Sequence, residues 1–124
     1  MSSQHDDSAG RPAIDVQPLI DELGDDPEML REIFGLVVKT TAECLAVIRT
    51  ANAAADARAL SHAAHTLKGS LLSVAAIPAG QAAAAVEAAA GAGDITTART
   101  AVATLEAELE RLRPALDALL TDPS

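Results

Sequence analysis

Alanine content is the feature that most constrains how this chain can fold. The 124 residues include 29 alanines but only one aromatic residue, Phe34. Alanine has the highest helix propensity, whereas the interiors of β-sheets usually need β-branched and aromatic side chains. Gly and Pro fall mostly between the apolar stretches. The composition therefore predicts closely packed helices and argues against an all-β fold.

The spacing of apolar residues and of helix-ending residues divides the chain into five helices. Gly24 should end the first helix, and Asp26 followed by Pro27 indicates the start of the second. Pro114 should kink the last helix or separate its final turns. Cys44 lies on the apolar stripe of the second helix and is expected to be buried there. We expect the helices at about residues 14–23, 27–53, 56–76, 78–90 and 95–120.

Four long amphipathic helices with short connections predict an all-α fold. The expected architecture is an up-down-up-down four-helix bundle with a short additional N-terminal helix across one end. Residues 1–13 are small and polar and show no apolar period, so we expect a disordered leader there. Residues 14–124 should then form a single helical bundle domain.

Charge and cysteine content exclude several classes of function. The net charge is −9, and no basic stripe is present, so a nucleic-acid or anionic-membrane binder is not expected. The single Cys44 excludes a disulfide within the chain and a Cys-based zinc cluster. No secretory signal or run of 18 apolar residues is present, so we expect a cytoplasmic protein without membrane contact. Nothing in the sequence requires a dimer, and a monomer is expected.

The predicted helix over residues 56–76 has two stripes of different character. Its core stripe is centred near Leu67, and Lys68 lies at the margin of the opposite stripe. That opposite stripe should face solvent and offer a surface for a partner. It consists of Arg58, His62, His65, Gly69, Leu72 and Ala76.

The outward stripe contains residues that an ordinary solvated helix face would not need. Gly69 costs about 1 kcal/mol relative to alanine inside a helix, and no core contact requires it. Leu72 is apolar where a charge would be usual. Imidazole is nucleophilic near neutral pH, and the Lys68 ammonium could neutralise phosphoryl oxygens near His65. From these residues alone, two interpretations remain open: a docking surface around a reactive His65, or ordinary solvated surface residues without a function.

The segment His65-Thr66-Leu67-Lys68-Gly69-Ser70 resembles the signature of histidine-containing phosphotransfer (HPt) domains of multistep two-component phosphorelays. The resemblance covers about residues 14–120. It implies that His65 accepts the phosphoryl group, that Lys68 steadies the phosphoryl oxygens and that Gly69 admits the partner's active site. It also implies that Glu87 hydrogen-bonds the Nδ1–H of the imidazole, although Glu87 as an ordinary solvated residue stays open.

The sequence departs from the family pattern at two positions. Family members commonly have glycine or another small residue at the positions of Leu72 and Ala75. Alanine is a mild change, but leucine is bulky. We expect Leu72 to narrow the choice of partner without abolishing transfer.

The implied activity is that of a phosphocarrier and not of an enzyme. No Gly-x-x-x-x-Gly-Lys loop is present, so the chain should bind no nucleotide and no cofactor of its own. Phosphate would come from a phospho-aspartate of one receiver domain and pass to an aspartate of another, with Mg²⁺ supplied by the receiver. By analogy with the family, the partners are the receiver domains of a hybrid sensor kinase and of a response regulator.

Three other interpretations compete with this one. A dimeric kinase core also exposes a helical histidine, but there an acidic residue normally follows it, and Thr66 stands here. A metal site from His62 and His65 lacks a third nearby ligand. The serious alternative is a helical-bundle adaptor that binds receiver domains without being phosphorylated.

Overall fold

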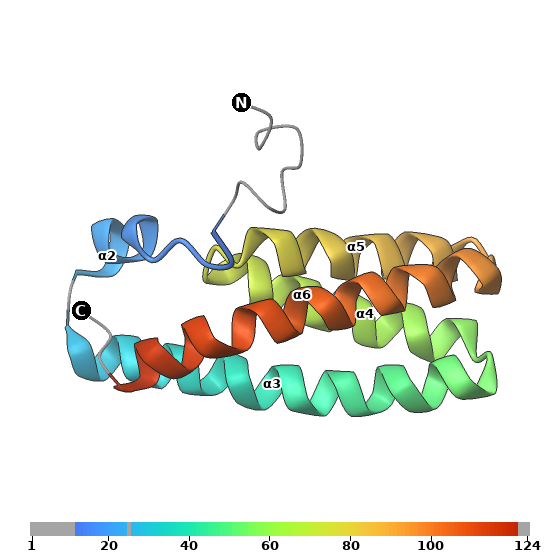
Figure 1. Ribbon diagram of the computed structural model, residues 1–124, viewed down its shortest axis with the longest axis horizontal. Helices are drawn as coiled ribbons and strands as arrows, with labels where there is room; N and C mark the ends of the chain where they lie inside the picture. The colour runs from blue at the N-terminus through green and yellow to red at the C-terminus, as the bar shows by residue number, and fades with distance from the viewer. Residues whose placement is uncertain (1–11, 25, 122–124) are drawn as a thin grey trace.

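The computed structural model describes residues 12–24 and 26–121, and every regular element in these residues is an α-helix (Figure 1). The all-helical fold predicted from the alanine content is therefore confirmed. Residues 1–11 of the predicted leader lie outside the described residues. The helices are α2 (Gln17–Leu23), α3 (Pro27–Ala54), α4 (Ala57–Ser73), α5 (Ile77–Gly91) and α6 (Ile95–Thr121).

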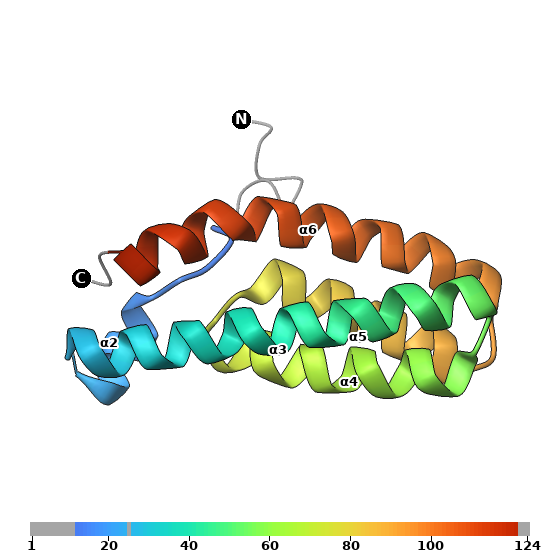
Figure 2. The same cartoon turned by 90° about the horizontal axis from the view of Figure 1, so that it is seen from below.

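The four long helices form a bundle in which each packs against two others. The contacts follow the ring order α3, α4, α5 and α6, with α6 returning to α3, and Figure 2 shows the same arrangement from a second direction. The short α2 lies beside the end of the bundle where α3 begins and buries Leu19 in the core (Figure 1). The buried side chains of α5 are small, with Val86 among the largest. Small side chains let α5 approach its neighbours closely, which matters for the site described below.

Aspartate side chains cap the N-termini of three of the four long helices. Asp26 accepts hydrogen bonds from the backbone N–H groups of Glu28 and Met29, as its position before Pro27 predicted. Asp56 accepts from Ala59 N at 3.1 Å. Such caps satisfy backbone donors that have no partner within the helix.

Two predicted helix ends were wrong, and proline helps to explain both. The first helix begins at Gln17 and not at residue 14, because the Pro18 ring would clash with a helical carbonyl four residues earlier. The helix α4 ends at Ser73 and not at Ala76. Ala75 takes a left-handed backbone conformation (φ +60°), and Ala76 is already the N-cap of α5, in which Pro78 occupies the first turn.

Of the two effects expected of Pro114, a kink or a separation of the last turns, the separation does not occur, because α6 continues through Pro114 to Thr121. Two ion pairs join residues three apart on this helix. Arg111 Nε lies 3.1 Å from Glu108 Oε1, and Arg113 Nη2 lies 2.8 Å from Glu110 Oε2.

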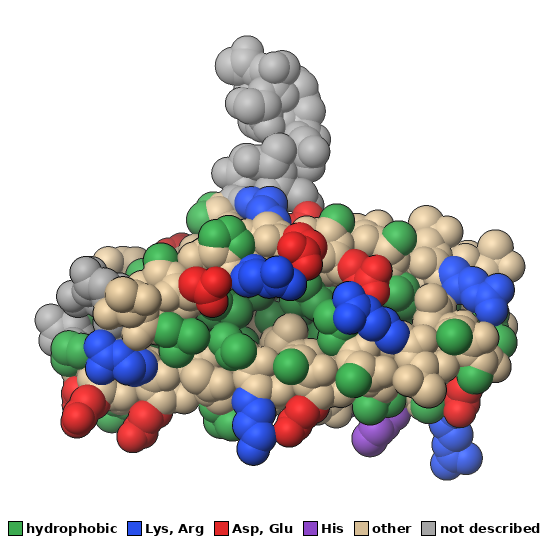
Figure 3. All heavy atoms as spheres, turned by 60° about the horizontal axis from the view of Figure 1, so that its bottom comes forward, with side chains coloured by type: hydrophobic (Ala, Val, Ile, Leu, Met, Phe, Trp, Pro, Cys, Tyr) green, Lys and Arg blue, Asp and Glu red, His purple; other side chains and the backbone are tan. Residues whose placement is uncertain are grey.

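The core is aliphatic and is centred on fully buried leucines together with Phe34 and Ile48. Cys44 is buried as predicted, and burial raises the pKa of its thiol with a smaller contribution from Glu43. A groove lies between α3 and α6, and Figure 3 shows it as an apolar hollow with charged side chains along its rim. The hydroxyl oxygen of Thr41, which lines this groove, is buried without a hydrogen-bond partner.

Candidate functional site

His65 lies on the outer face of α4, opposite the side chains that bury the helix. Leu60, Leu67 and Leu71 are fully buried, and the helical period turns His65 away from them. The His65 side chain is 63% exposed. The imidazole is therefore open to another macromolecule, as the sequence predicted.

Glu87 of α5 fixes one nitrogen of this imidazole. His65 Nδ1 lies 2.8 Å from Glu87 Oε2. An ionised carboxylate can only accept, so the proton of the ring lies on Nδ1, which donates to Glu87. The neutral ring then carries its free lone pair on Nε2. The expected contact between Glu87 and the imidazole is thus present in the structure.

The second oxygen of Glu87 holds Lys68. Lys68 Nζ lies 2.8 Å from Glu87 Oε1, and both side chains are a little over a quarter exposed. The hydrogen bond from Lys68, and then that from His65, hold the pKa of Glu87 below its usual value in spite of partial desolvation. Glu87 is therefore ionised near neutral pH and bridges the two basic side chains.

The sequence did not predict the pair between Lys68 and Glu87, although one signal for it was present. Glu87 is the only charged residue of α5. Because α5 has no basic residue of its own, a basic partner for Glu87 has to come from a neighbouring helix. The backbone of Glu87 is also tied to α4, because Ser61 Oγ donates to Glu87 O at 3.3 Å.

A hollow of about 590 Å³ opens beside the imidazole between α4 and α5. Arg58 and His62 line it on the α4 side together with Ser61, and Glu87 lines it on the α5 side. Both Arg58 and His62 are exposed, as predicted. Ser61 is a lining residue that the sequence reasoning missed.

The face around His65 also contains Gly69, which leaves the surface without a side chain there as predicted. Gly69 is exposed, and a Cβ built on it would meet no atom within 4 Å apart from its own helix and chain neighbours. No contact within the chain thus requires glycine there. Leu72 is 42% exposed, but part of its side chain lies over Gly80 of α5, where an added Cβ would come within 2.8 Å of Leu72 Cγ.

A comparison with protein-family models matches residues 32–115 to the Hpt domain. This match covers more than half of the chain and includes His65, Lys68 and Glu87. The chain belongs to the Hpt domain family. Neither the comparison with curated proteins nor that with solved structures gave a match.

Hpt domains are helical-bundle phosphocarriers of phosphorelays, and they interact with receiver domains. The signature His-x-Leu-Lys-Gly of this Hpt domain lies in mid-helix on α4 with its histidine outward. The family expected from that signature is thereby confirmed.

One residue predicted on the outward face of this Hpt domain is not there. Ala76 is fully buried, because α4 has ended three residues earlier and Ala76 begins the next helix. The outward face of α4 therefore stops at Leu72 and Ser73, and the expectation that Ala76 contacts a partner was wrong.

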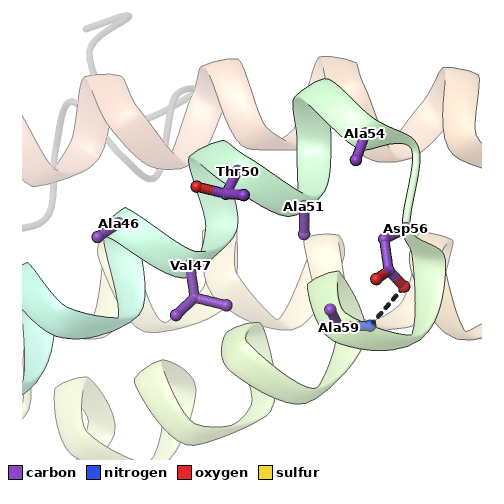
Figure 4. A pocket seen from close by; sticks show the side chains of 7 residues that line it. All are labelled: Ala46, Val47, Thr50, Ala51, Ala54, Asp56 and Ala59. Atoms are coloured by element: carbon purple, nitrogen blue, oxygen red, sulfur yellow. Dashed lines mark hydrogen bonds between the residues drawn. The ribbon is translucent and has the colours of Figure 1, made fainter.

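A second shallow depression lies between α3 and the start of α4 and has a different character (Figure 4). Its lining is mostly alanine with Val47 and Thr50. Asp56 is its one charged side chain, and that carboxylate caps α4. This depression offers no group for chemistry.

The described residues of the Hpt domain offer neither a metal site nor a membrane-spanning helix. They contain no group of three or more His, Cys, Asp or Glu side chains placed to hold a metal ion. No helix among them combines the length and hydropathy needed to cross a membrane.

Proposed function

We propose that this Hpt domain carries a phosphoryl group on His65 between the aspartates of two receiver domains. The observation that carries the proposal is the hydrogen bond from His65 Nδ1 to Glu87, together with the 63% exposure of the imidazole. An exposed Nε2 with its lone pair outward is the geometry that nucleophilic attack on phosphorus requires.

The proposed step conserves atoms and charge. The Nε2 lone pair forms a bond to phosphorus while the bond between phosphorus and the partner's aspartate oxygen breaks, and the electrons of that bond return to the carboxylate. The onward step reverses these changes on another aspartate. Mg²⁺ would belong to the receiver, and this chain would bind no cofactor.

The outward face of α4 would form the surface that binds the receiver domain. Arg58, His62, Gly69 and Leu72 would contact the receiver, and the bulk of Leu72 would narrow the choice of partner. The partners would be receiver domains of a hybrid sensor kinase and of a response regulator in the cytoplasm, with the Hpt domain acting as a monomer. The connections of two or three residues between the long helices support an up-down-up-down order of the bundle.

A labelling experiment tests the proposal. Receiver domains of the source organism are phosphorylated with radiolabelled acetyl phosphate and mixed with the Hpt domain. We expect label that is lost in acid and stable in alkali, absent from His65→Gln and retained by His5→Gln. Binding of a receiver without any transfer of label would instead favour the adaptor, and equal labelling of His65→Gln would refute the assignment.

A further inference from the structure

Arg58 is an arginine that the fold leaves without a partner. In residues 12–24 and 26–121, the other arginines each donate a hydrogen bond or form an ion pair within the chain, namely Arg31, Arg49, Arg99, Arg111 and Arg113. Arg58 does neither with any residue of these ranges, and it is exposed. Its guanidinium is therefore open to a group of another molecule.

Arg58 lies near the histidine along α4. It precedes His65 by seven residues, which is two helical turns or about 10 Å of rise. Both side chains line the hollow of about 590 Å³ beside the imidazole, with His62 between them on α4. The α5 side of this hollow is lined by small residues such as Gly91 and by Glu87. A side chain of a bound partner can therefore enter between Arg58 and His65.

The charge of α4 differs from that of the rest of the molecule. This helix contains Arg58 and Lys68 and no acidic residue. The whole chain has 9 Lys and Arg against 18 Asp and Glu, so 7 of these bases and all 18 acids lie outside α4. The one acid of α5, Glu87, already pairs with Lys68 and His65. An acidic surface of a partner is therefore attracted to α4 and repelled by the acidic remainder.

Two aspartates at the same end of the bundle are engaged as helix caps. Asp56 and Asp94 stand before α4 and α6, which both begin at this end (Figure 1). Asp56 accepts from Ala59 N, and Asp94 accepts from Thr97 N, each at 3.1 Å. Neither forms an ion pair with Arg58 within the described part of the chain. The charge of Arg58 is thus not matched by an ion pair of its own.

A guanidinium is well suited to binding a carboxylate. Its planar fork donates two parallel hydrogen bonds to the two carboxylate oxygens, and it stays charged at physiological pH. We infer that Arg58 binds a carboxylate of the receiver domain, beside the aspartate that exchanges the phosphoryl group, and so selects receivers with an acidic side chain there. This inference rests on the proposed function. Its consequence is that salt slows transfer, since salt screens an exposed charge pair.

The salt dependence of transfer tests the inference. A labelled receiver from the experiment above is mixed with the Hpt domain over a series of NaCl concentrations, and the second-order rate constant is measured. Arg58→Gln removes the charge. We expect its rate constant at low salt to be about tenfold below that of the wild type and to depend less on salt. The maximal rate at saturating receiver should hardly change, because Arg58 acts in binding.

Two further variants separate a carboxylate contact from a general effect of charge. Arg58→Lys keeps the charge but loses the fork, so it should retain the salt dependence and transfer more slowly than wild type. Lys39→Gln removes one positive charge from an exposed position of α3 outside the hollow, and it should behave as wild type. Loading of His65 by phosphoramidate, which brings no carboxylate, should be equally fast in Arg58→Gln and wild type.

The outcomes are distinguishable from a failure of the proposed function. Absence of label on wild-type His65 would refute the function itself. A labelled wild type whose rate and salt dependence equal those of Arg58→Gln would overturn only the inference, and so would equal effects of Arg58→Gln and Lys39→Gln. Slower loading of Arg58→Gln by phosphoramidate would also overturn it, because Arg58 would then act on the phosphoryl group and not on the receiver.

Discussion

At the scale of single residues, the site consists of groups that the fold itself does not need. The side chain of His65 points outward, and Gly69 has no atom of another element near its missing Cβ. Lys68 and Glu87 pair at the surface, where an ion pair adds little to stability. Such residues are free to serve a partner, and their replacement should change function more than folding.

Gly69 gives the first prediction at this scale. Gly69→Ala should raise the free energy of unfolding by up to about 1 kcal/mol, because alanine is the better helix former and has open space there. The same change should slow phosphoryl exchange with a receiver, since the methyl group projects into the docking surface. Urea unfolding and labelling rates measure the two effects.

Gly35→Ala is the matched control for this substitution. Gly35 lies on α3, and its added Cβ would meet only Leu120 Cδ2 at 4.0 Å. It should also stabilise the chain but leave exchange unchanged. Equal exchange rates for Gly69→Ala and wild type would show that the bare position has no role in docking.

Asp94 gives a prediction about pH. Its carboxylate accepts from the Thr97 hydroxyl at 2.7 Å and from Thr97 N at 3.1 Å, and these two bonds hold the pKa of Asp94 below its usual value of 3.8. A carboxyl whose pKa is lowered by folding stabilises the protein above its unfolded pKa, and this stabilisation is lost as the pH falls through the folded pKa.

The stability difference between wild type and Asp94→Ala should therefore be constant above about pH 5 and shrink below pH 3.8. Urea unfolding at a series of pH values measures it. A difference that stays the same down to about pH 2 would contradict the assignment of the cap.

At the scale of helices, the contact between α4 and α5 is the one that builds the site. The small side chains of α5 bring its backbone near α4, so that the short side chain of Glu87 reaches both His65 and Lys68. Gly80 leaves the space that the Leu72 side chain occupies over α5. The small side chains packed between α4 and α5 thus determine where Glu87 meets the imidazole of His65.

Gly80 and Leu72 should be energetically coupled. Gly80→Ala alone should lower the free energy of unfolding by about 1–3 kcal/mol, because its methyl group would overlap the Leu72 side chain. In a Leu72→Ala background the overlap is gone, and Gly80→Ala should become neutral or stabilising by up to about 1 kcal/mol. A double-mutant cycle measures the coupling, and additive effects would contradict the packing described here.

At the scale of the whole molecule, few large side chains fill the interior. Phe34 is the only aromatic residue and is fully buried. Phe34→Ala should lower the free energy of unfolding by about 3–5 kcal/mol, a large share of the total for a domain of this size. A thermal melt checks this, and Phe34→Leu should cost clearly less. A melting temperature unchanged by Phe34→Ala would place this side chain outside the core.

Local sequence signals predicted the helices well where one residue type decides the outcome. Asp26 before Pro27, Gly24 and the buried stripe around Leu67 all act through short-range rules, and the structure agrees with them. The end of α4 was missed because Ala75 takes a left-handed conformation that alanine rarely adopts. Ala76 was consequently placed on the wrong face.

The arrangement of the site depended on distance between helices, which periodicity does not give. The exposure of His65 followed from its place in the helical turn. The pairing of Glu87 with both His65 and Lys68 depends on how closely α4 and α5 approach and on the rotation of α5. The resemblance to HPt domains implied one of these contacts, and only the structure gave the other.

The most direct test of the account is to find which atom carries the phosphoryl group. Proton–nitrogen NMR of the loaded Hpt domain, with detection of coupling to phosphorus, distinguishes the two ring nitrogens. We expect phosphorus on Nε2 of His65, with the proton still on Nδ1 next to Glu87. Phosphorus on Nδ1, or on any residue other than His65, would contradict the account.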